Sequence, residues 1–178
     1  IEKSPDLFDG WQFKGDILSS QGDAAGAMLA YQKAKELRPA HLPAHAAIIR
    51  LLLADGKLDE AKQQLAAMQK VAPGHPQTTY LQALLAYQQK DFPAAKEFIL
   101  QMFKFSPDSP LGLQLAGLIE YELKAYPQAE AYLIKALPNT PELGIARRVL
   151  IATYLRNSQP GKALTVLTPV LDKIDKDS

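Results

Sequence analysis

Three histidines are the side chains with the clearest potential for metal chemistry in this sequence. His41 and His45 are four residues apart, a spacing at which two imidazoles on one helix face can hold a metal ion. Pro43 lies between them and suits the start of a helix, so the two rings need not share a face. No H-E-x-x-H motif and no third carboxylate ligand accompanies this pair or His75. We therefore predict no metal site and interpret the histidines as polar loop residues.

Motifs for catalysis are absent as well. The sequence has no G-x-S-x-G nucleophile elbow, no Walker loop and no G-x-G-x-x-G dinucleotide loop. Glu120 and Glu122 are two residues apart on an expected helix, so they point to different sides and form no carboxylate pair. The absence of cysteine excludes a thiol nucleophile and a thiolate metal site. The sequence predicts a protein that is not an enzyme and that uses no cofactor.

The charge balance narrows the range of partners. Twenty Lys and Arg stand against 19 Asp and Glu in 178 residues, and this net charge of +1 excludes capture of nucleic acid by bulk electrostatics. A hydrophobic fraction of 47% with 22% charged residues is typical of folded domains. No apolar run reaches the roughly 18 residues that a membrane span needs. We expect neither nucleic-acid binding nor direct membrane insertion of this segment.

The positions of alanine and proline reveal an internal repeat. An alanine recurs every 34 residues without an insertion, at Ala27, Ala61, Ala95, Ala129 and Ala163. A proline recurs with the same period, at Pro5, Pro39, Pro73, Pro107 and Pro141. Periods of this length indicate stacked supersecondary units, each of which contacts its neighbours.

Within each period the residue pattern predicts a helix, a short turn and a second helix. In residues 76–109 the apolar residues first recur at helical spacing, residues 89–91 form a polar turn, and a second helix begins at Pro93. Gly22 and Gly56 are expected to serve the turn in the first two repeats.

Small residues predict where the two helices of a repeat approach closely. Gly15, Ala83 and Gly117 on the first helices are expected to match the periodic alanines of the second helices. Ile49 and Ile151 occupy the same position in the second and fifth repeats. We therefore expect wider separation of the helices in those two repeats.

This pattern resembles the tetratricopeptide repeat (TPR) family. The first repeat matches the family's preferred residues most fully, with Trp11, Gly15, Leu18, Gly22, Ala27, Tyr31, Ala34 and Pro39. The resemblance implies an all-α fold, a right-handed superhelical α-solenoid of helix-turn-helix repeats, and a non-enzymatic scaffold for protein–protein interaction. It divides the chain into residues 1–7, the tail of a truncated upstream repeat, and repeats at 8–41, 42–75, 76–109, 110–143 and 144–178, the last with a short tail.

The two ends predict that the natural protein continues on both sides. The chain begins at Ile1, and residues 4–6 have the same Ser-Pro-Asp sequence as residues 106–108, where a later repeat ends. Residues 172–178 are charged and do not form the polar capping helix that terminal repeats normally have. Pro169 is expected to interrupt the second helix of the last repeat.

Three segments also resemble the TPR lipoproteins of the bacterial PEP-CTERM/exosortase system, which accompany exopolysaccharide gene clusters. These segments are Gly22-Asp23 before an Ala-rich helix, residues 91–95, and residues 164–171 with Pro169. The resemblance implies a periplasmic or envelope-associated protein, with a parent tethered by a lipid on an N-terminal cysteine. It links the chain to PEP-CTERM protein sorting or exopolysaccharide export, and a cytoplasmic location is the alternative.

The TPR resemblance also implies a partner-binding groove, because first helices line the concave face in that family. Carried over to this sequence, the groove comprises Gln12, Arg50, Leu53, Tyr80, Leu84, Tyr87, Gln114, Leu118, Tyr121, Arg148, Leu155 and Arg156. Tyr87 and Tyr121 are 34 residues apart and are expected to stack from one repeat to the next. The alternative is that these tyrosines pack between neighbouring repeats. The cationic residues that hold a C-terminal carboxylate in chaperone-binding members are absent, so we expect a partly apolar protein or peptide segment.

Two other functions stay open at this stage. The array could associate with itself into a homo-oligomer through apolar helix faces at its ends. It could also bind carbohydrate in an export system, through tyrosines and the basic end, since residues 144–178 hold six Lys and Arg against three Asp.

Overall fold

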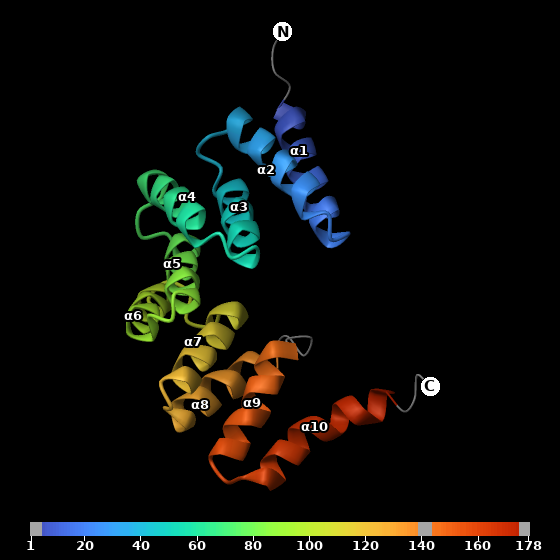
Figure 1. Cartoon of the computed structure of the whole chain (residues 1–178), viewed down its shortest axis with the longest axis vertical. Helices are drawn as coiled ribbons and strands as arrows, with labels where there is room; N and C mark the ends of the chain where they lie inside the picture. The colour runs from blue at the N-terminus through green and yellow to red at the C-terminus, as the bar shows by residue number, and fades with distance from the viewer. Residues whose placement is uncertain (1–4, 139–143, 175–178) are drawn as a thin grey trace. The chain divides into compact units, whose positions relative to one another are not determined.

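The computed structural model describes residues 5–138 and 144–174, which form ten helices joined by turns (Figure 1). The helices are α1 (Pro5–Ser20), α2 (Ala24–Leu37), α3 (Leu42–Ala54), α4 (Leu58–Val71), α5 (Pro76–Gln88), α6 (Phe92–Phe103), α7 (Pro110–Glu122), α8 (Tyr126–Ala136), α9 (Gly144–Arg156) and α10 (Pro160–Ile174). The described residues contain no strand. The all-α fold of the sequence prediction is therefore confirmed.

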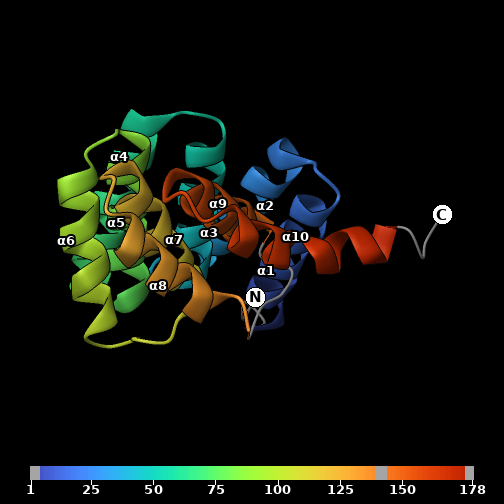
Figure 2. The same cartoon turned by 90° about the horizontal axis from the view of Figure 1, so that it is seen from below.

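Two compact units divide the chain, Ile1–Gln89 and Lys90–Ser178. In the N-terminal unit each of the helices α1 to α5 packs on the next, and in the C-terminal unit α6 to α10 do the same. Figure 1 and Figure 2 both show α7, α8 and α9 side by side. The boundary falls inside the predicted third repeat, so α5 and α6 belong to different compact units.

The first and last helices differ from the sequence predictions. Helix α1 begins at Pro5, so residues 5–7, predicted as the tail of an upstream repeat, continue directly into the first helix. Residues 1–4 lie outside the described residues, as do Pro141 and the charged residues 175–178. A proline at the start of a helix costs nothing, because its missing N–H would be unpaired there in any case.

The predicted interruption at Pro169 was wrong, because α10 runs from Pro160 to Ile174. A proline inside a helix removes one backbone donor. Two hydroxyls make local bonds nearby, from Thr165 Oγ1 to the Gly161 carbonyl at 3.1 Å and from Thr168 Oγ1 to the Leu164 carbonyl at 2.9 Å. These bonds use carbonyls on the helix itself, and the helix continues past the proline.

The periodic alanines are buried, as close packing of the helices requires. Exposure is 0% at Ala27, Ala61, Ala95 and Ala129, and 5% at Ala163. The small residues of the first helices face a different neighbour from the predicted one. A Cβ on Gly15 would lie 2.5 Å from the Tyr31 ring, and one on Gly117 would lie 2.5 Å from Leu133. Tyr31 and Leu133 each follow the alanine by one turn, so glycine makes room for a large side chain rather than for the alanine.

The extent of packing follows the size of the residue on the first helix. The α1–α2 and α7–α8 pairs, which have Gly15 and Gly117, pack more extensively than α3–α4 and α9–α10. Ile49 and Ile151 stand at the same position in the last two pairs. The predicted wider separation in these repeats agrees with this difference.

Each turn between the two helices of a repeat contains one residue with left-handed backbone. The φ angles are 81° at Gly22, 72° at Gly56, 61° at Lys90, 61° at Lys124 and 55° at Ser158. The five residues are 34 positions apart, so the turn has one backbone geometry that different residue types adopt. Glycine adopts it freely, whereas in other residues the close approach of Cβ to the carbonyl oxygen costs about 1–2 kcal/mol.

We predict that Lys124→Gly stabilises the protein by about 1 kcal/mol and that Gly22→Ala destabilises it by about the same amount. The physical reason is the strain of a Cβ at positive φ, which is present at Lys124 and absent at Gly22. Urea unfolding followed by circular dichroism measures both changes.

Gly161→Ala is the matched control, because Gly161 has ordinary backbone and, as at Gly22, an added Cβ would meet no atom within 4 Å. This variant should lose no stability. Equal losses in Gly22→Ala and Gly161→Ala would contradict the assignment of strain to the turn.

Candidate functional site

The first helices of the N-terminal unit present a set of residues that we call the α1–α3–α5 face (Gln12, Asp16, Arg50, Tyr80 and Leu84), part of which is hydrogen-bonded. Gln12 Nε2 donates to Asp16 Oδ1 at 3.2 Å. The Tyr31 hydroxyl, which comes from α2, donates to the same oxygen at 2.8 Å. The structure thus joins the predicted residue Gln12 to α2 through a shared carboxylate.

Arg50 on α3 acts electrostatically on one phenol of α2 and on one of α5. Burial raises the pKa values of both Tyr31 and Tyr80, and the positive charge of Arg50 opposes that rise. Arg50 therefore lies close enough to both phenols to act on them electrostatically, and its own side chain is exposed. The structure brings the predicted residues Arg50 and Tyr80 together on this face.

Tyr31 has the most strongly perturbed phenol of the face. Burial, the hydrogen bond to Asp16 and the negative charge of Asp16 raise its pKa to about 12, in that order of importance. Sequence reasoning identified Tyr31 only as one of the residues that match the family pattern of the first repeat. The sequence feature that could have indicated this role is Asp16, an acceptor for the Tyr31 hydroxyl that lies one turn after Gln12 on the first helix.

Leu53 does not belong to an accessible site. It is 3% exposed and packs in the core of the N-terminal unit with Ile49 and Leu81. Its inclusion among the groove residues was wrong, because α3 is apolar on nearly all sides and buries this position between neighbouring helices. Tyr80 and Leu84 pack partly against the same core, so each presents only part of its side chain.

The predicted stack of Tyr87 on Tyr121 stays a prediction. Tyr87 lies on α5 in the N-terminal unit, whereas Tyr121 lies on α7 in the C-terminal unit. Both side chains are half-buried.

The C-terminal unit presents a second set, the α7–α9 face, with Gln114, Leu118, Tyr121, Arg148, Leu155 and Arg156. Gln114, Leu118 and Tyr121 are half-buried on α7. Arg148 and Arg156 are exposed on α9, and Leu155 between them is 57% exposed. The structure therefore places the predicted basic end of the chain on the surface, next to an exposed apolar side chain.

Tyr121 has the packing role that the sequence left open as the alternative to groove binding. Its ring packs against the core around Leu133 and Leu150, and its centroid lies 5.7 Å from that of Tyr126. A hydrogen bond with Tyr121 also raises the pKa of Arg156. The ring thus fills space between helices while the hydroxyl helps to place a cation on the face.

Two glutamines at the same position of repeats one and four have unsatisfied oxygens. Gln12 Oε1 and Gln114 Oε1 are buried and have no hydrogen-bond partner among the described residues. An unsatisfied buried acceptor costs about 1–3 kcal/mol, and such groups call for an explanation such as an absent ligand or water. Because the last torsion of a glutamine is broad, a small rotation can turn its oxygen towards a donor on the surface.

The histidines have structural roles. His45 Nε2 lies 2.8 Å from the Pro39 carbonyl in a buried position. The His41 ring meets Phe8 edge to face with centroids 4.3 Å apart, and His75 caps the start of α5. Within residues 5–138 and 144–174, no group of three or more His, Asp or Glu could hold a metal ion. The same ranges contain no helix with the length and apolar composition of a membrane span.

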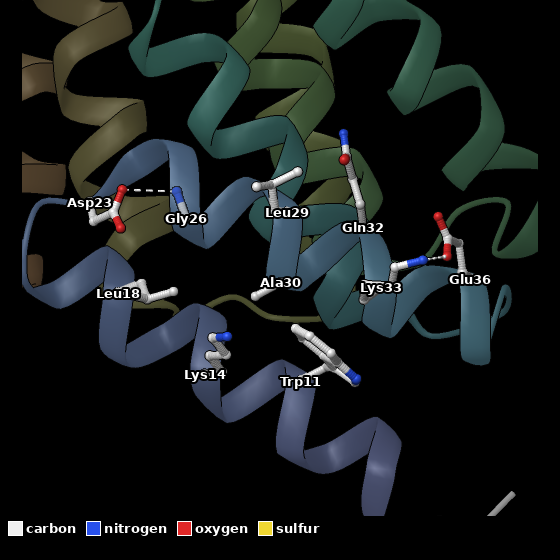
Figure 3. A pocket seen from close by; sticks show the side chains of 10 residues that line it. All are labelled: Trp11, Lys14, Leu18, Asp23, Gly26, Leu29, Ala30, Gln32, Lys33 and Glu36. Carbon is white, nitrogen blue, oxygen red and sulfur yellow. Dashed lines mark hydrogen bonds and ion pairs between the residues drawn. The ribbon is translucent and has the colours of Figure 1, made fainter.

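Sequence reasoning missed two open grooves on either side of α2. The first, of about 600 Å³, lies between α1 and α2, and Trp11 and Leu18 point into it (Figure 3). We call it the α1–α2 groove. The second, of about 700 Å³, lies between α2 and α3 and shares Leu29 with the first. The sequence contained one indication of the first groove. The charged residue Lys14 occupies the repeat position at which the second repeat has the apolar Ile48, which indicates an uncovered surface.

Comparison with known families and structures places this fold. Residues 18–86 match a family model described as tetratricopeptide repeat. No curated protein matches the chain.

Several solved structures have the same all-α helical repeat fold. A thermophilic TPR protein of Thermus thermophilus is 19% identical with a TM-score of 0.81, covering 96% of this chain and 93% of that one. PilF of Pseudomonas aeruginosa is 17% identical with a TM-score of 0.76, covering 92% and 74%. YrrB, described as a TPR protein with an unusual peptide-binding site, is 16% identical with a TM-score of 0.60, covering 91% and 84%.

We predict that Tyr31→Phe costs about 1 kcal/mol at pH 7, because it removes the hydrogen bond to Asp16. It should also weaken the loss of stability at alkaline pH. The folded pKa of about 12 lies above the ordinary value of 10.0, so the contribution of Tyr31 is complete below pH 10 and disappears as the pH rises towards 12.

Urea unfolding of both proteins at pH 8 and at pH 11.5 tests this prediction. Asp16→Asn is the control, since it keeps an acceptor near the phenol and removes the charge. An identical pH dependence of wild type and Tyr31→Phe would show that Tyr31 is not the perturbed group.

Proposed function

We propose that this chain, which is a tetratricopeptide-repeat protein, is a non-enzymatic scaffold that binds a segment of a partner protein on the first helices of its repeats. The observation that carries the proposal is the α7–α9 face. There the exposed side chains of Arg148, Leu155 and Arg156 lie on one helix, next to a helix with the unsatisfied oxygen of Gln114. The peptide-binding site described for the TPR protein YrrB supports a peptide-like ligand.

The chemistry of the α7–α9 face favours a partly apolar segment with acidic residues. A guanidinium group can bind a carboxylate through two parallel hydrogen bonds. Leu155 offers apolar area that a partner side chain can cover, and Gln114 offers an acceptor for a backbone N–H of an extended segment. The cations, the apolar side chain and the acceptor match three different features of one peptide.

The α1–α3–α5 face offers a different chemistry. Asp16 accepts hydrogen bonds from Gln12 and Tyr31, and Arg50 is the exposed cation. This face is suited to a polar segment with both donors and acceptors. The two faces belong to different compact units, and each is proposed as a binding surface by itself.

The envelope location, the lipid-anchored parent and the link to PEP-CTERM sorting or exopolysaccharide export are proposals that rest on the sequence resemblance. A fusion of the full-length gene product to a reporter that is active only outside the cytoplasm tests the location.

We predict that the double variant Leu155→Ser/Arg156→Ser loses at least about tenfold in affinity for peptides that the wild-type chain selects. The probes are peptides recovered from a display library of random 12-residue sequences, with affinities measured by fluorescence anisotropy. Both residues are exposed, so the fold should not change. We expect the selected peptides to be enriched in acidic and apolar residues.

Leu100→Ser/Lys104→Ser is the matched control, because it removes one exposed apolar side chain and one exposed cation at α6. It should keep wild-type affinity. Equal losses in both double variants, or a library that yields no binding peptide, would contradict the proposal. Binding of acidic polysaccharide without peptide binding would favour the carbohydrate alternative.

A further inference from the structure

One interface recurs along the chain, in which the second helix of a repeat packs on the first helix of the next. It joins α2 to α3, α4 to α5, α6 to α7 and α8 to α9. Each of these four pairs lies within one compact unit.

The side chains that meet at this interface keep the same spacing. Lys96 on α6 forms an ion pair of 2.8 Å with Glu120 on α7, 24 residues later. Glu130 on α8 is hydrogen-bonded to Tyr154 on α9, again at this spacing. Burial raises the pKa of Tyr154 most, followed by the negative charge of Glu130 and then by this hydrogen bond. In the first repeat Met28 packs against the core that contains Leu52, also 24 residues later. The chemistry therefore varies while the geometry of contact does not.

Two longer spacings join the second helices of successive repeats, beside this interface. Lys35 Nζ donates to Gln64 Oε1 at 3.0 Å across 29 residues. The Phe103 ring stacks on Tyr132 at the same spacing, with centroids 5.8 Å apart. Lys162 pairs with Glu130 at 3.0 Å across 32 residues.

On helix α10, the positions that contact the following repeat in the inner second helices are exposed. Leu164 stands at the repeat position of Met28 and Glu130, and Leu171 stands at that of Lys35. Leu164 is 61% exposed and Leu171 is 45% exposed, whereas the corresponding side chains of the inner repeats are half-buried, apart from Lys62, which is exposed. The two leucines are seven residues apart, so they form an apolar stripe on one side of the helix.

The α1–α2 groove contains the positions that, in the inner repeats, contact the second helix of the preceding repeat. Leu18 is at the repeat position of Leu52, which receives Met28. Ala30 is at the position of Gln64, and Gly26 is at that of Lys162. Leu18, Gly26 and Ala30 all line the groove of about 600 Å³ (Figure 3). If a helix like α10 preceded α1, the spacings of 24, 32 and 29 residues would bring it against Leu18, Gly26 and Ala30. All three of these residues line the groove.

We propose that α10 of one copy docks in the α1–α2 groove of a second copy and continues the internal interface between molecules. The repeat spacing places Leu164 against Leu18 and Gly26, and Leu171 against Ala30. All of these are apolar contacts, of the kind that Met28 makes inside the chain. The two surfaces differ, so the contact is head to tail and extends into open chains of molecules unless it closes into a ring.

Lys14 makes this contact weaker than the internal one. The same repeat position holds Ile48, Gln82, Ala116 and Leu150, of which Gln82 is half-buried and the other three are buried. Lys14 is exposed at the groove, and its Nζ lies 5.0 Å from the centre of the Trp11 ring. Docking must cover this cation or displace it, so the association is expected to be reversible and dependent on concentration.

Sedimentation velocity of the full 178-residue chain over a hundredfold range of concentration tests the proposal. The wild type should show a mass that rises with concentration. Leu164→Asp/Leu171→Asp should weaken the association at least about tenfold, because it places carboxylates in an apolar groove. Lys14→Leu should strengthen it, because the groove then matches the inner repeats.

Mixing two defective variants tests the head-to-tail geometry. Lys14→Glu/Leu29→Asp changes two exposed residues of the groove and leaves α10 intact. Alone, this variant and Leu164→Asp/Leu171→Asp should each stay monomeric at concentrations at which the wild type first associates. Their mixture should form a 1:1 complex and nothing larger, because one intact groove and one intact α10 remain.

Phe105→Asp/Leu111→Asp is the control, because both residues are exposed apolar side chains outside the two surfaces. It should associate like the wild type, and circular dichroism should show the wild-type fold in every variant. A wild type that stays monomeric at the highest concentration would overturn the proposal. Association that persists in Leu164→Asp/Leu171→Asp, or a mixture that forms no complex, would also overturn it.

Discussion

Each helix of this protein has apolar faces that only another helix can bury, because a pair of helices is too small to enclose a core. The periodic alanine allows the two helices within one repeat to pack closely. It is fully buried at Ala27 and Ala129, where a glycine on the facing helix makes room for the large side chain one turn later. The remaining faces are buried by the neighbouring repeats, so the stability of each repeat depends on the repeats next to it.

The contact between repeats tolerates very different chemistry at one position. Met28 makes an apolar contact, Lys96 forms an ion pair with the 5% exposed side chain of Glu120, and Glu130 bonds to both Lys162 and Tyr154. A buried carboxylate is costly unless it is paired, so Lys96 is needed once Glu120 is present. Paired polar contacts of this kind also fix the partner of each helix, whereas an apolar stripe accepts any helix of suitable shape. Because the stripe of α10 is apolar and has no paired polar contact, it can pack against a second copy, as we propose.

The surfaces that remain after this packing have two kinds of use. The first helices present cations, tyrosines and glutamine amides, for which we propose a peptide segment as partner. Helix α10 and the α1–α2 groove present the two surfaces of the proposed contact between copies. A partner segment on the α7–α9 face and a second copy on the α1–α2 groove would occupy different surfaces of the same molecule.

By itself the sequence determined the period, the helix-turn-helix repeats and the all-α fold, because the spacing of small, apolar and turn residues is a local property. It also placed Arg148 and Arg156 on one helix, since side chains eight residues apart lie on nearby faces of a helix. Only the tertiary structure decided which apolar residues are covered. It buried Leu53, joined Tyr31 to Asp16, continued α10 past Pro169 and opened the α1–α2 groove. Burial and hydrogen bonding depend on the neighbouring helix, and the periodic pattern of one helix does not contain that information.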